Sequence, residues 1–247
     1  MNPTVILVGA DKGGVGKTTV SRVLLDHLGS LKIGARAFDT EYPRGTLKRF
    51  HPKATQIVDV RSSSDQMKIL DTLSNAGPSV SIIDARAGQL SLTLAMLEEV
   101  GFLEAVAAGE FNFLLFHVIG PSIASLDEIA EIAPYASEAN YFLVKNFIND
   151  TTFFEWDPQT SAAYFKKIKR VGDITIPKLN ELAYEQVELA GVPFASFVNN
   201  KNASGGSANY SFVLRGYVRT WLRNISAEFD RVGLIPAMGL APAKRTR

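Results

Sequence analysis

Short runs of apolar, often β-branched residues recur along the chain, and the first of them is followed by a segment with helical periodicity. In that segment, residues 17–28, apolar side chains recur on one side, which indicates an amphipathic helix. Strands that are apolar on both sides are typical of parallel sheets covered by helices on both faces. We therefore predict an α/β fold with a doubly wound, mostly parallel sheet. Its strands are predicted at residues 4–8, 35–38, 80–83, 113–118, 141–144 and 174–176.

The rest of the pattern favours a single domain spanning residues 1–247, because the chain contains no repeat, low-complexity tract or proline-rich linker. Residues 199–209 are rich in Asn, Ser and Gly and predict a mobile loop. A C-terminal helix is predicted at about 210–231. The glycines and prolines that follow it predict a flexible tail over 233–247.

The composition is that of a globular protein, with 46% hydrophobic and 21% charged residues. The absence of cysteine excludes disulfides, iron–sulfur clusters, thiolate zinc sites and cysteine nucleophiles. No apolar run approaches the roughly 20 residues that span a bilayer, and the N-terminus lacks the basic flank of a signal peptide. We therefore expect a cytoplasmic protein without stable membrane insertion.

The strongest chemical signal is the segment 11–19, which follows the first predicted strand and opens the first predicted helix. Its glycines let the backbone turn tightly and aim amides at phosphate oxygens, and the helix N-terminus adds a partial positive charge. Lys17 would bring a full charge to the β and γ phosphates, and the Thr18 hydroxyl would be a Mg²⁺ ligand. The predicted phosphate-binding residues are Asp11, Lys12, Gly13, Gly14, Val15, Gly16, Lys17, Thr18 and Thr19.

This loop departs from the ordinary Walker A pattern, because Asp11 stands where the first glycine belongs and Lys12 is followed by two glycines. The string Lys-Gly-Gly-Val-Gly-Lys-Thr-Thr resembles the deviant Walker A motif of the ParA/MinD family of ATPases. The resemblance implies a P-loop NTPase fold, ATP and Mg²⁺ as ligands, and a homodimer that forms with ATP. It also implies that Lys12 reaches the phosphates of the partner subunit. A cation that arrives only on dimerisation would couple hydrolysis to assembly.

Two further segments resemble the same family in their order and context. Asp39 matches the first aspartate of an Asp-x-Asp-Pro-Gln pattern, and Glu41 replaces the second, which positions the attacking water in relatives. Because Glu41 is one methylene longer, we expect slow or partner-dependent hydrolysis. Asp84 ends a buried strand as in a Walker B motif, and the predicted Mg²⁺ ligands are Thr18, Asp39 and Asp84. Residues 85–88 resemble switch II, where a glycine amide senses the γ phosphate.

Two residues near the ends of later strands match positions that bind adenine in relatives. Asn146 follows the run 141–144, and Pro177 follows 174–176. The resemblance implies that Asn146 reads the base and that Pro177 lines its pocket. A role as a turn residue explains either one equally well.

Charge is unevenly distributed along the chain, although the net charge is only +1. Residues 201–247 hold eight basic side chains and two acidic ones, whereas residues 87–144 hold eight acidic side chains and no Lys or Arg. Such asymmetry predicts different faces for different partners.

The predicted C-terminal helix carries Arg215, Arg219 and Arg223, which recur every four residues and so share one face. Such a row would grip a nucleic-acid backbone, although it also fits the solvated edge of a docked helix. Together with the resemblance, the row predicts a ParA-like ATPase that dimerises with ATP and binds DNA non-specifically. In that reading a cargo or adaptor protein stimulates slow hydrolysis, and the protein partitions or positions a plasmid, a chromosome or a protein cargo.

Two other functions remain open at this point. A MinD-like switch would bind a membrane or a regulatory protein in place of DNA, but membrane binding favours a terminal helix with an exposed apolar face. An ATP-dependent metabolic ligase would need charged groups for a substrate beside the γ phosphate, and the sequence identifies none. DNA binding measured with ADP and with ATP across a salt series discriminates among these functions.

Overall fold

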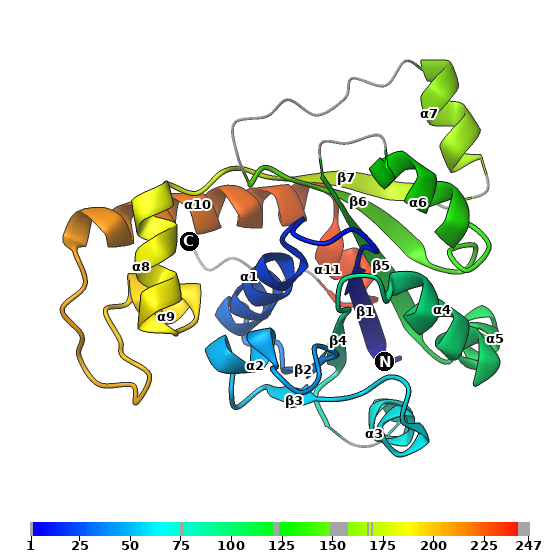
Figure 1. The fold of residues 1–247 in the computed structure, drawn as a ribbon, viewed down its shortest axis with the longest axis horizontal. Coiled ribbons are helices and arrows are strands. Elements are labelled where there is room, and N and C mark those ends of the chain that lie inside the picture. Colours follow the sequence, from blue (N-terminus) through cyan, green and yellow to red (C-terminus); the bar gives the residue numbers. More distant parts are fainter. Residues whose placement is uncertain are drawn as a thin grey trace.

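A seven-stranded, entirely parallel sheet runs through the molecule and carries helices on both faces (Figure 1). The structure is a computed structural model that describes residues 2–74, 77–120, 124–148, 158–166, 168 and 170–241. The strand order is β3-β2-β4-β1-β5-β6-β7, which confirms the predicted doubly wound sheet. The strands are β1 (Thr4–Gly9), β2 (Ala35–Asp39), β3 (Thr55–Ile57), β4 (Val80–Asp84), β5 (Asn112–Ile119), β6 (Asn140–Asn146) and β7 (Arg170–Ile176).

The helices connect successive strands and cover the two faces of the sheet (Figure 1). The helices that precede β7 are α1 (Lys17–Ser30), α2 (Thr46–Phe50), α3 (Ser63–Ser74), α4 (Leu90–Glu99), α5 (Phe102–Ala107), α6 (Ala124–Ile132) and α7 (Pro158–Phe165). Those that follow it are α8 (Glu181–Ala190), α9 (Phe194–Val198), α10 (Phe212–Arg231) and α11 (Leu234–Ala237).

The strand order places a topological switch point at β1. From β1 the chain crosses to β2, β3 and β4 on one side, and then continues through β5, β6 and β7 on the other. Ligands of doubly wound sheets bind in the crevice at the carboxyl ends of the strands where this direction reverses. The register pairs Val8 of β1 with Asp84 of β4, and Asp84 with Asp39 of β2, so the predicted acidic residues reach the same edge.

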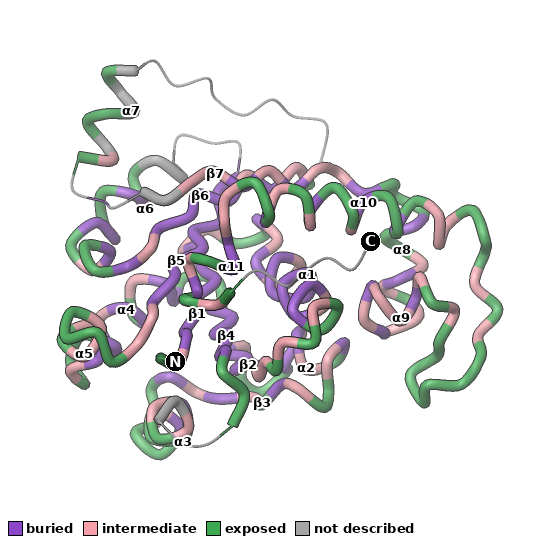
Figure 2. The backbone as a smooth tube through the Cα atoms, turned by 180° about the vertical axis from the view of Figure 1, so that it is seen from behind, coloured by how far each residue is buried: buried purple, intermediate pink, exposed green. Residues whose placement is uncertain are grey.

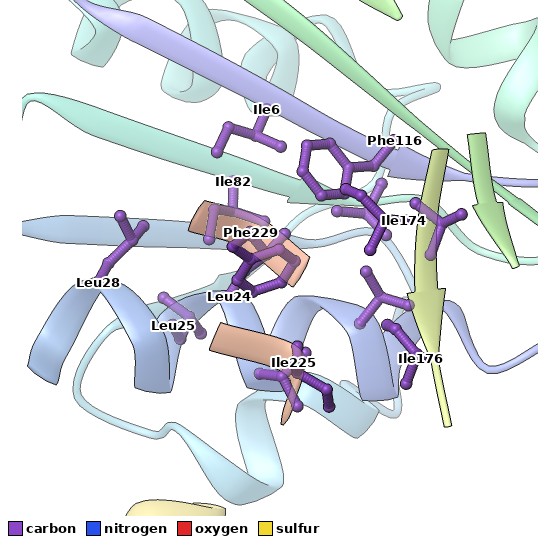
Figure 3. Close-up of a cluster of buried hydrophobic side chains, with 14 of the residues drawn as sticks. Ile6, Leu24, Leu25, Leu28, Ile82, Phe116, Ile174, Ile176, Ile225 and Phe229 are labelled. Atoms are coloured by element: carbon purple, nitrogen blue, oxygen red, sulfur yellow. The ribbon is translucent and has the colours of Figure 1, made fainter. Parts of the chain in front are cut away.

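Alternating side chains of the strands pack into one core on each face. On the face of α1 and α10, Ile6 and Phe116 contact a cluster that includes Leu24 of α1 and Phe229 of α10 (Figure 3). The opposite face holds a second core, in which Leu7 and its neighbours pack against α4 and α6. Figure 2 shows β1, β4, β5, β6 and α1 buried for most of their length. Two buried faces explain why the sequences of β1, β4, β5 and β6 are mostly apolar.

The segment after α10 differs from the expected flexible tail. Leu234–Ala237 forms α11, and Leu234, Ile235 and Met238 are buried. The Met238 carbonyl also accepts hydrogen bonds from the Thr4 hydroxyl at 2.9 Å and from the side-chain amide of Asn112 at 3.1 Å. The prediction is therefore wrong for residues 233–241, because apolar side chains between the glycines and prolines anchor them to the sheet. Residues 242–247 lie outside the described part of the chain.

Two other expectations concern segments that follow β7 along the chain. The predicted C-terminal helix is present as α10, with an N-cap at Ser211 whose hydroxyl accepts from the Leu214 amide. The polar segment 199–209 forms a compact turn closed by a bridge between Lys201 and Ser207.

Strand β3 was not predicted, since it has only three residues and one of them is exposed.

Candidate functional site

A cavity of about 500 Å³ opens at the carboxyl edge of the sheet, at the switch point beside β1. It joins the phosphate loop, the ends of β2 and β4, and the segments that follow β6 and β7. Ten of the predicted residues line it: Gly14, Gly16, Lys17, Thr18, Thr19, Asp39, Glu41, Asp84, Asn146 and Pro177. The predicted phosphate-loop residues Asp11, Lys12, Gly13 and Val15 lie outside this lining.

The phosphate loop owes its path to glycines at positions with positive φ. Gly14 has φ 73° and Gly16 has φ 87°, a region that favours glycine, and α1 begins directly after Gly16. The loop is also held from β6, where the Asn146 amide nitrogen donates to the Val15 carbonyl at 2.9 Å. A Cβ on Gly16 would lie only 2.1 Å from that nitrogen. The loop is therefore preformed, and its glycine at position 16 is required by both backbone angle and space.

Lys17 is buried at the base of the loop, and its ammonium donates to the Lys12 carbonyl at 3.0 Å. Burial lowers the pKa of the Lys17 ammonium, and the charges of Asp84 and Glu128 oppose that shift. A buried cation surrounded by carboxylates and facing a cavity fits an anionic ligand that replaces the carbonyl contact.

Asp84 is buried at the end of β4 and accepts hydrogen bonds from the Thr18 and Ser21 hydroxyls, both at 2.9 Å. Burial, with added repulsion from Asp39, raises the pKa of Asp84 to about 7. Two adjacent buried carboxylates and a threonine hydroxyl are hard oxygen donors of the kind that Mg²⁺ prefers. In the described ranges no three Asp, Glu or His side chains gather into a metal site. Thr18, Asp39 and Asp84 fit a Mg²⁺ ion that would take its other ligands from phosphate and water.

The segment after β2 is held by Asp39. One of its carboxylate oxygens accepts the Glu41 amide at 3.0 Å, and the other accepts the Lys48 amide at 3.1 Å. Burial raises the pKa of Asp39, although these backbone hydrogen bonds oppose the shift. Asp39 thus fixes the loop that carries Glu41, whose carboxylate accepts a hydrogen bond from the Thr46 hydroxyl. Direct coordination of a metal by Asp39 stays a prediction.

Asp11 does not line the cavity, and it holds the segment that resembles switch II. It accepts the Leu90 amide at 2.8 Å and also binds Ser91, so it caps the N-terminus of α4. The Asp11 carbonyl accepts the Gly88 amide at 2.8 Å. Nucleotide binding by Asp11 stays a prediction, and in this structure its side chain joins the phosphate loop to α4. A short acidic side chain at a helix N-terminus is satisfied by free amides.

Part of the cavity is lined by apolar side chains, and some of them are not among the predicted site residues. Trp221 of α10 lines it and donates its indole N–H to the Pro177 carbonyl at 2.6 Å. Tyr184 of α8 also borders the cavity, and its hydroxyl lies 3.4 Å from the Thr19 hydroxyl. The spacing of Trp221 with the buried Ile225 predicts a docked face, but nothing in the sequence marks where that face meets a cavity.

The three arginines of α10 do not project together. Arg219 and Arg223 are exposed, whereas Arg215 is half-buried and donates to the Val198 carbonyl at 3.4 Å. Each four-residue step turns a helix by about 40° beyond a full revolution, so Arg215 and Arg223 diverge by about 80°. The predicted row is therefore shortened to Arg219 and Arg223. In the described part of the chain, no helix is both long and apolar enough to cross a membrane.

Three hydrogen-bonded side chains next to the phosphate loop were not predicted from the sequence. Glu128 of α6 binds the loop backbone and the ring of His117, which in turn contacts Tyr141. Residue types alone gave no signal for this group, because its members come from three separate elements.

Known structures share this architecture, although no protein-family model and no curated protein matches the sequence. A ParA family ATPase from Chlorobium tepidum TLS matches with a TM-score of 0.53 and 14% identity, over 90% of this chain and 98% of that chain. The septum site-determining protein MinD from Pyrococcus horikoshii OT3, complexed with Mg-ADP, matches with a TM-score of 0.52 and 15% identity, over 94% and 98%. The chain thus has a ParA/MinD-like fold, as the resemblance implied.

Proposed function

We propose that this protein binds Mg–ATP in the cavity at the carboxyl edge of the sheet and hydrolyses it slowly. The observation that carries the proposal is that a buried ammonium, Lys17, and the Thr18–Asp84 pair line one cavity beside the preformed glycine loop. The similar MinD structure holds Mg-ADP, which supports the same ligand class here.

The residues of the cavity have separable roles in this proposal. Lys17 and the amides of the loop neutralise and orient the phosphates, which is the main way that proteins accelerate phosphoryl transfer. Thr18 and Asp84 would hold Mg²⁺, which supplies charge neutralisation on the phosphate oxygens. Glu41 lines the cavity on the loop that Asp39 fixes, so its carboxylate can orient a water for attack. The apolar part of the cavity near Trp221 fits a flat base.

ATP turnover by single variants tests the proposed activity. Lys17→Ala removes the cation that contacts the phosphates, and we expect turnover to be lost. Lys53→Ala, an exposed lysine before β3, is the matched control and should hydrolyse ATP like the wild type. Equal turnover by Lys17→Ala and the wild type would refute the assignment.

We further propose that ATP promotes a homodimer in which Lys12 acts on the partner's phosphates, as its place in the deviant motif suggests. Light scattering with a non-hydrolysable ATP analogue should show a dimer for the wild type and a monomer for Lys12→Ala. A Lys12→Ala protein that dimerises and hydrolyses ATP normally would exclude the role in trans.

The proposed partner of the ATP-bound dimer is DNA of any sequence, with partition or positioning of a cargo as its use. Support comes from the exposed Arg219 and Arg223 and from the basic balance of residues 201–247. A dimer would present two such pairs, so avidity would make binding depend on nucleotide. Glu41, longer than the aspartate of relatives, suits slow hydrolysis that an adaptor or cargo protein stimulates.

DNA binding is tested by titration with ADP or an ATP analogue across a salt series. We expect binding only with the analogue, with an affinity that falls steeply with salt. Arg219→Glu with Arg223→Glu should abolish binding and leave dimerisation intact. The control is Lys53→Glu with Arg61→Glu, which makes the same charge change beside β3, at the opposite edge of the sheet from β7. If wild-type protein with the analogue fails to bind at low salt, the DNA proposal is wrong.

A second candidate is a MinD-like switch that binds a membrane or a regulatory protein. It is favoured by apolar side chains exposed on α8 and at the start of α10, where Leu189 is 71% exposed and Phe212 is 74% exposed. Sedimentation with vesicles of anionic phospholipid distinguishes it from DNA binding. ATP-dependent sedimentation without DNA binding would favour this candidate.

A further inference from the structure

A buried carboxylate holds the backbone of the phosphate loop at the two residues that distinguish this loop. One oxygen of Glu128 accepts the Lys12 amide at 2.9 Å, and the other accepts the Asp11 amide at 3.0 Å. Glu128 is only 8% exposed although it comes from α6, more than one hundred residues further along the chain. A carboxylate that binds two successive amides fixes the orientation of the peptide between them.

The orientation of Glu128 is set in turn by His117 of β5, which is fully buried. The His117 Nε2 lies 3.2 Å from the Glu128 oxygen that accepts the Asp11 amide, and Nδ1 lies 2.8 Å from the Tyr141 hydroxyl. Because an ionised carboxylate only accepts, Nε2–H donates to Glu128. In a neutral ring Nδ1 then accepts from the Tyr141 hydroxyl.

The electrostatics of Glu128 agree with an ionised, fixed group. Burial raises the pKa of its carboxyl, but hydrogen bonds from His117 and from the two backbone amides outweigh burial and hold that pKa below its usual range. Glu128 does not line the nucleotide cavity, so it contacts no substrate there. It acts through its hydrogen bonds to the backbone of the phosphate loop.

The same short stretch of backbone is fixed from a second direction. The Asp11 side chain caps α4, and the Lys12 carbonyl accepts the Lys17 ammonium. In this structure the peptide groups on both sides of Lys12 are therefore bound to other parts of the chain, and the contact with Glu128 remains when phosphate replaces that of Lys17. Small errors in the direction of a charged side chain cost much of its effect on a transition state.

We propose that Glu128, oriented by His117, is a positioning residue for Lys12, because it fixes the peptide from which the Lys12 side chain projects. This inference rests on the proposed function, in which Lys12 acts on the phosphates of the partner subunit. Glu128 then matters for the step that needs the partner and not for nucleotide binding by a single subunit.

Glu128→Gln tests this inference, because it keeps the size of the side chain and turns one oxygen into an N–H₂ donor. That donor faces an N–H group, so one amide loses its partner. We expect ATP-analogue-dependent dimerisation to weaken about tenfold and ADP affinity of the monomer to stay within about twofold. Glu131→Gln changes an exposed glutamate one turn along α6 and should alter neither quantity.

The outcomes separate the inference from the proposed function. Normal dimerisation by Glu128→Gln beside a defective Lys12→Ala overturns the inference alone. Equal loss of ADP affinity and of dimerisation also overturns it, because Glu128 would then support the whole loop. Normal dimerisation by Lys12→Ala overturns the role of Lys12 in trans and this inference with it.

A milder variant keeps the test decisive if Glu128→Gln does not fold. Tyr141→Phe preserves the buried ring and removes the hydroxyl that holds His117. We expect a smaller loss of dimerisation, of a few-fold, with unchanged ADP affinity. Unchanged dimerisation by a folded Tyr141→Phe would then overturn the inference.

Discussion

Replacing Gly16 by alanine perturbs the phosphate loop at the point where its backbone has the least freedom to adapt. Gly16 has φ 87°, and a Cβ built there would lie 2.1 Å from the amide nitrogen of Asn146. The side chain of Asn146 must therefore move, and its hydrogen bond of 2.9 Å to the Val15 carbonyl is lost. Both effects act on the conformation that is expected to receive phosphate.

The size of the effect follows from these two contributions. A left-handed backbone costs a residue with a Cβ roughly 1–2 kcal/mol relative to glycine. The lost hydrogen bond contributes about 1 kcal/mol. A total of about 2–3 kcal/mol corresponds to a fall in nucleotide affinity of roughly 30- to 150-fold if the native loop is needed for binding.

Calorimetric titration of ADP with Mg²⁺ measures this change, and urea unfolding without nucleotide measures the cost to the free protein. Gly29→Ala is the control, because a Cβ at that helical position meets nothing within 4 Å. It should leave affinity unchanged and stabilise the protein slightly. If Gly16→Ala binds nucleotide as tightly as the wild type and is equally stable, the loop does not have this conformation.

Three further predictions address catalysis, stability and pH. Glu41→Gln should lower ATP turnover about 100-fold or more with unchanged ATP affinity, measured by phosphate release, and unaltered turnover would move the water-orienting role elsewhere. Phe229→Ala should lower the free energy of unfolding, measured in urea, by about 3–5 kcal/mol, because this ring is buried between α10 and the sheet. A loss below about 1 kcal/mol would contradict the docking of α10 on the sheet. Burial raises the pKa of Asp26 to about 7, so its contribution to stability is fully present below pH 4 and is lost as the pH rises towards 7. Asp26→Asn should therefore remove that part of the pH dependence, at most about 4 kcal/mol, while its side-chain oxygen still accepts the Ala195 amide. If the variant and the wild type show the same difference in stability between pH 4 and pH 8, the assignment is wrong.

The fold could be predicted because buried parallel strands leave continuous apolar runs, and these runs locate six of the seven strands. The exception, β3, has three residues, one of them exposed, so it leaves no such run. The prediction of a flexible tail after α10 was wrong for another reason. Its glycines and prolines indicate breaks, but the burial of Leu234 and Met238 depends on tertiary contacts that no local pattern shows.

The candidate site could be predicted where residue type and position both depend on the chemistry. Lys17, Thr18 and Asp84 meet as expected, because each follows directly from a strand end or a helix start. The side-chain contacts of Asp11 with α4 could not be predicted, because its position in the motif says nothing about where its side chain points. Glu128 was missed because its contacts join residues far apart in the sequence.

Titration of Mg–ATP into the wild type and into Lys17→Ala in a calorimeter tests directly whether this cavity binds Mg–ATP. We predict one nucleotide bound per wild-type chain, no measurable binding by Lys17→Ala, and unchanged thermal unfolding of the variant without nucleotide. Absence of binding by the wild type, or equal binding by a folded Lys17→Ala, would contradict this prediction.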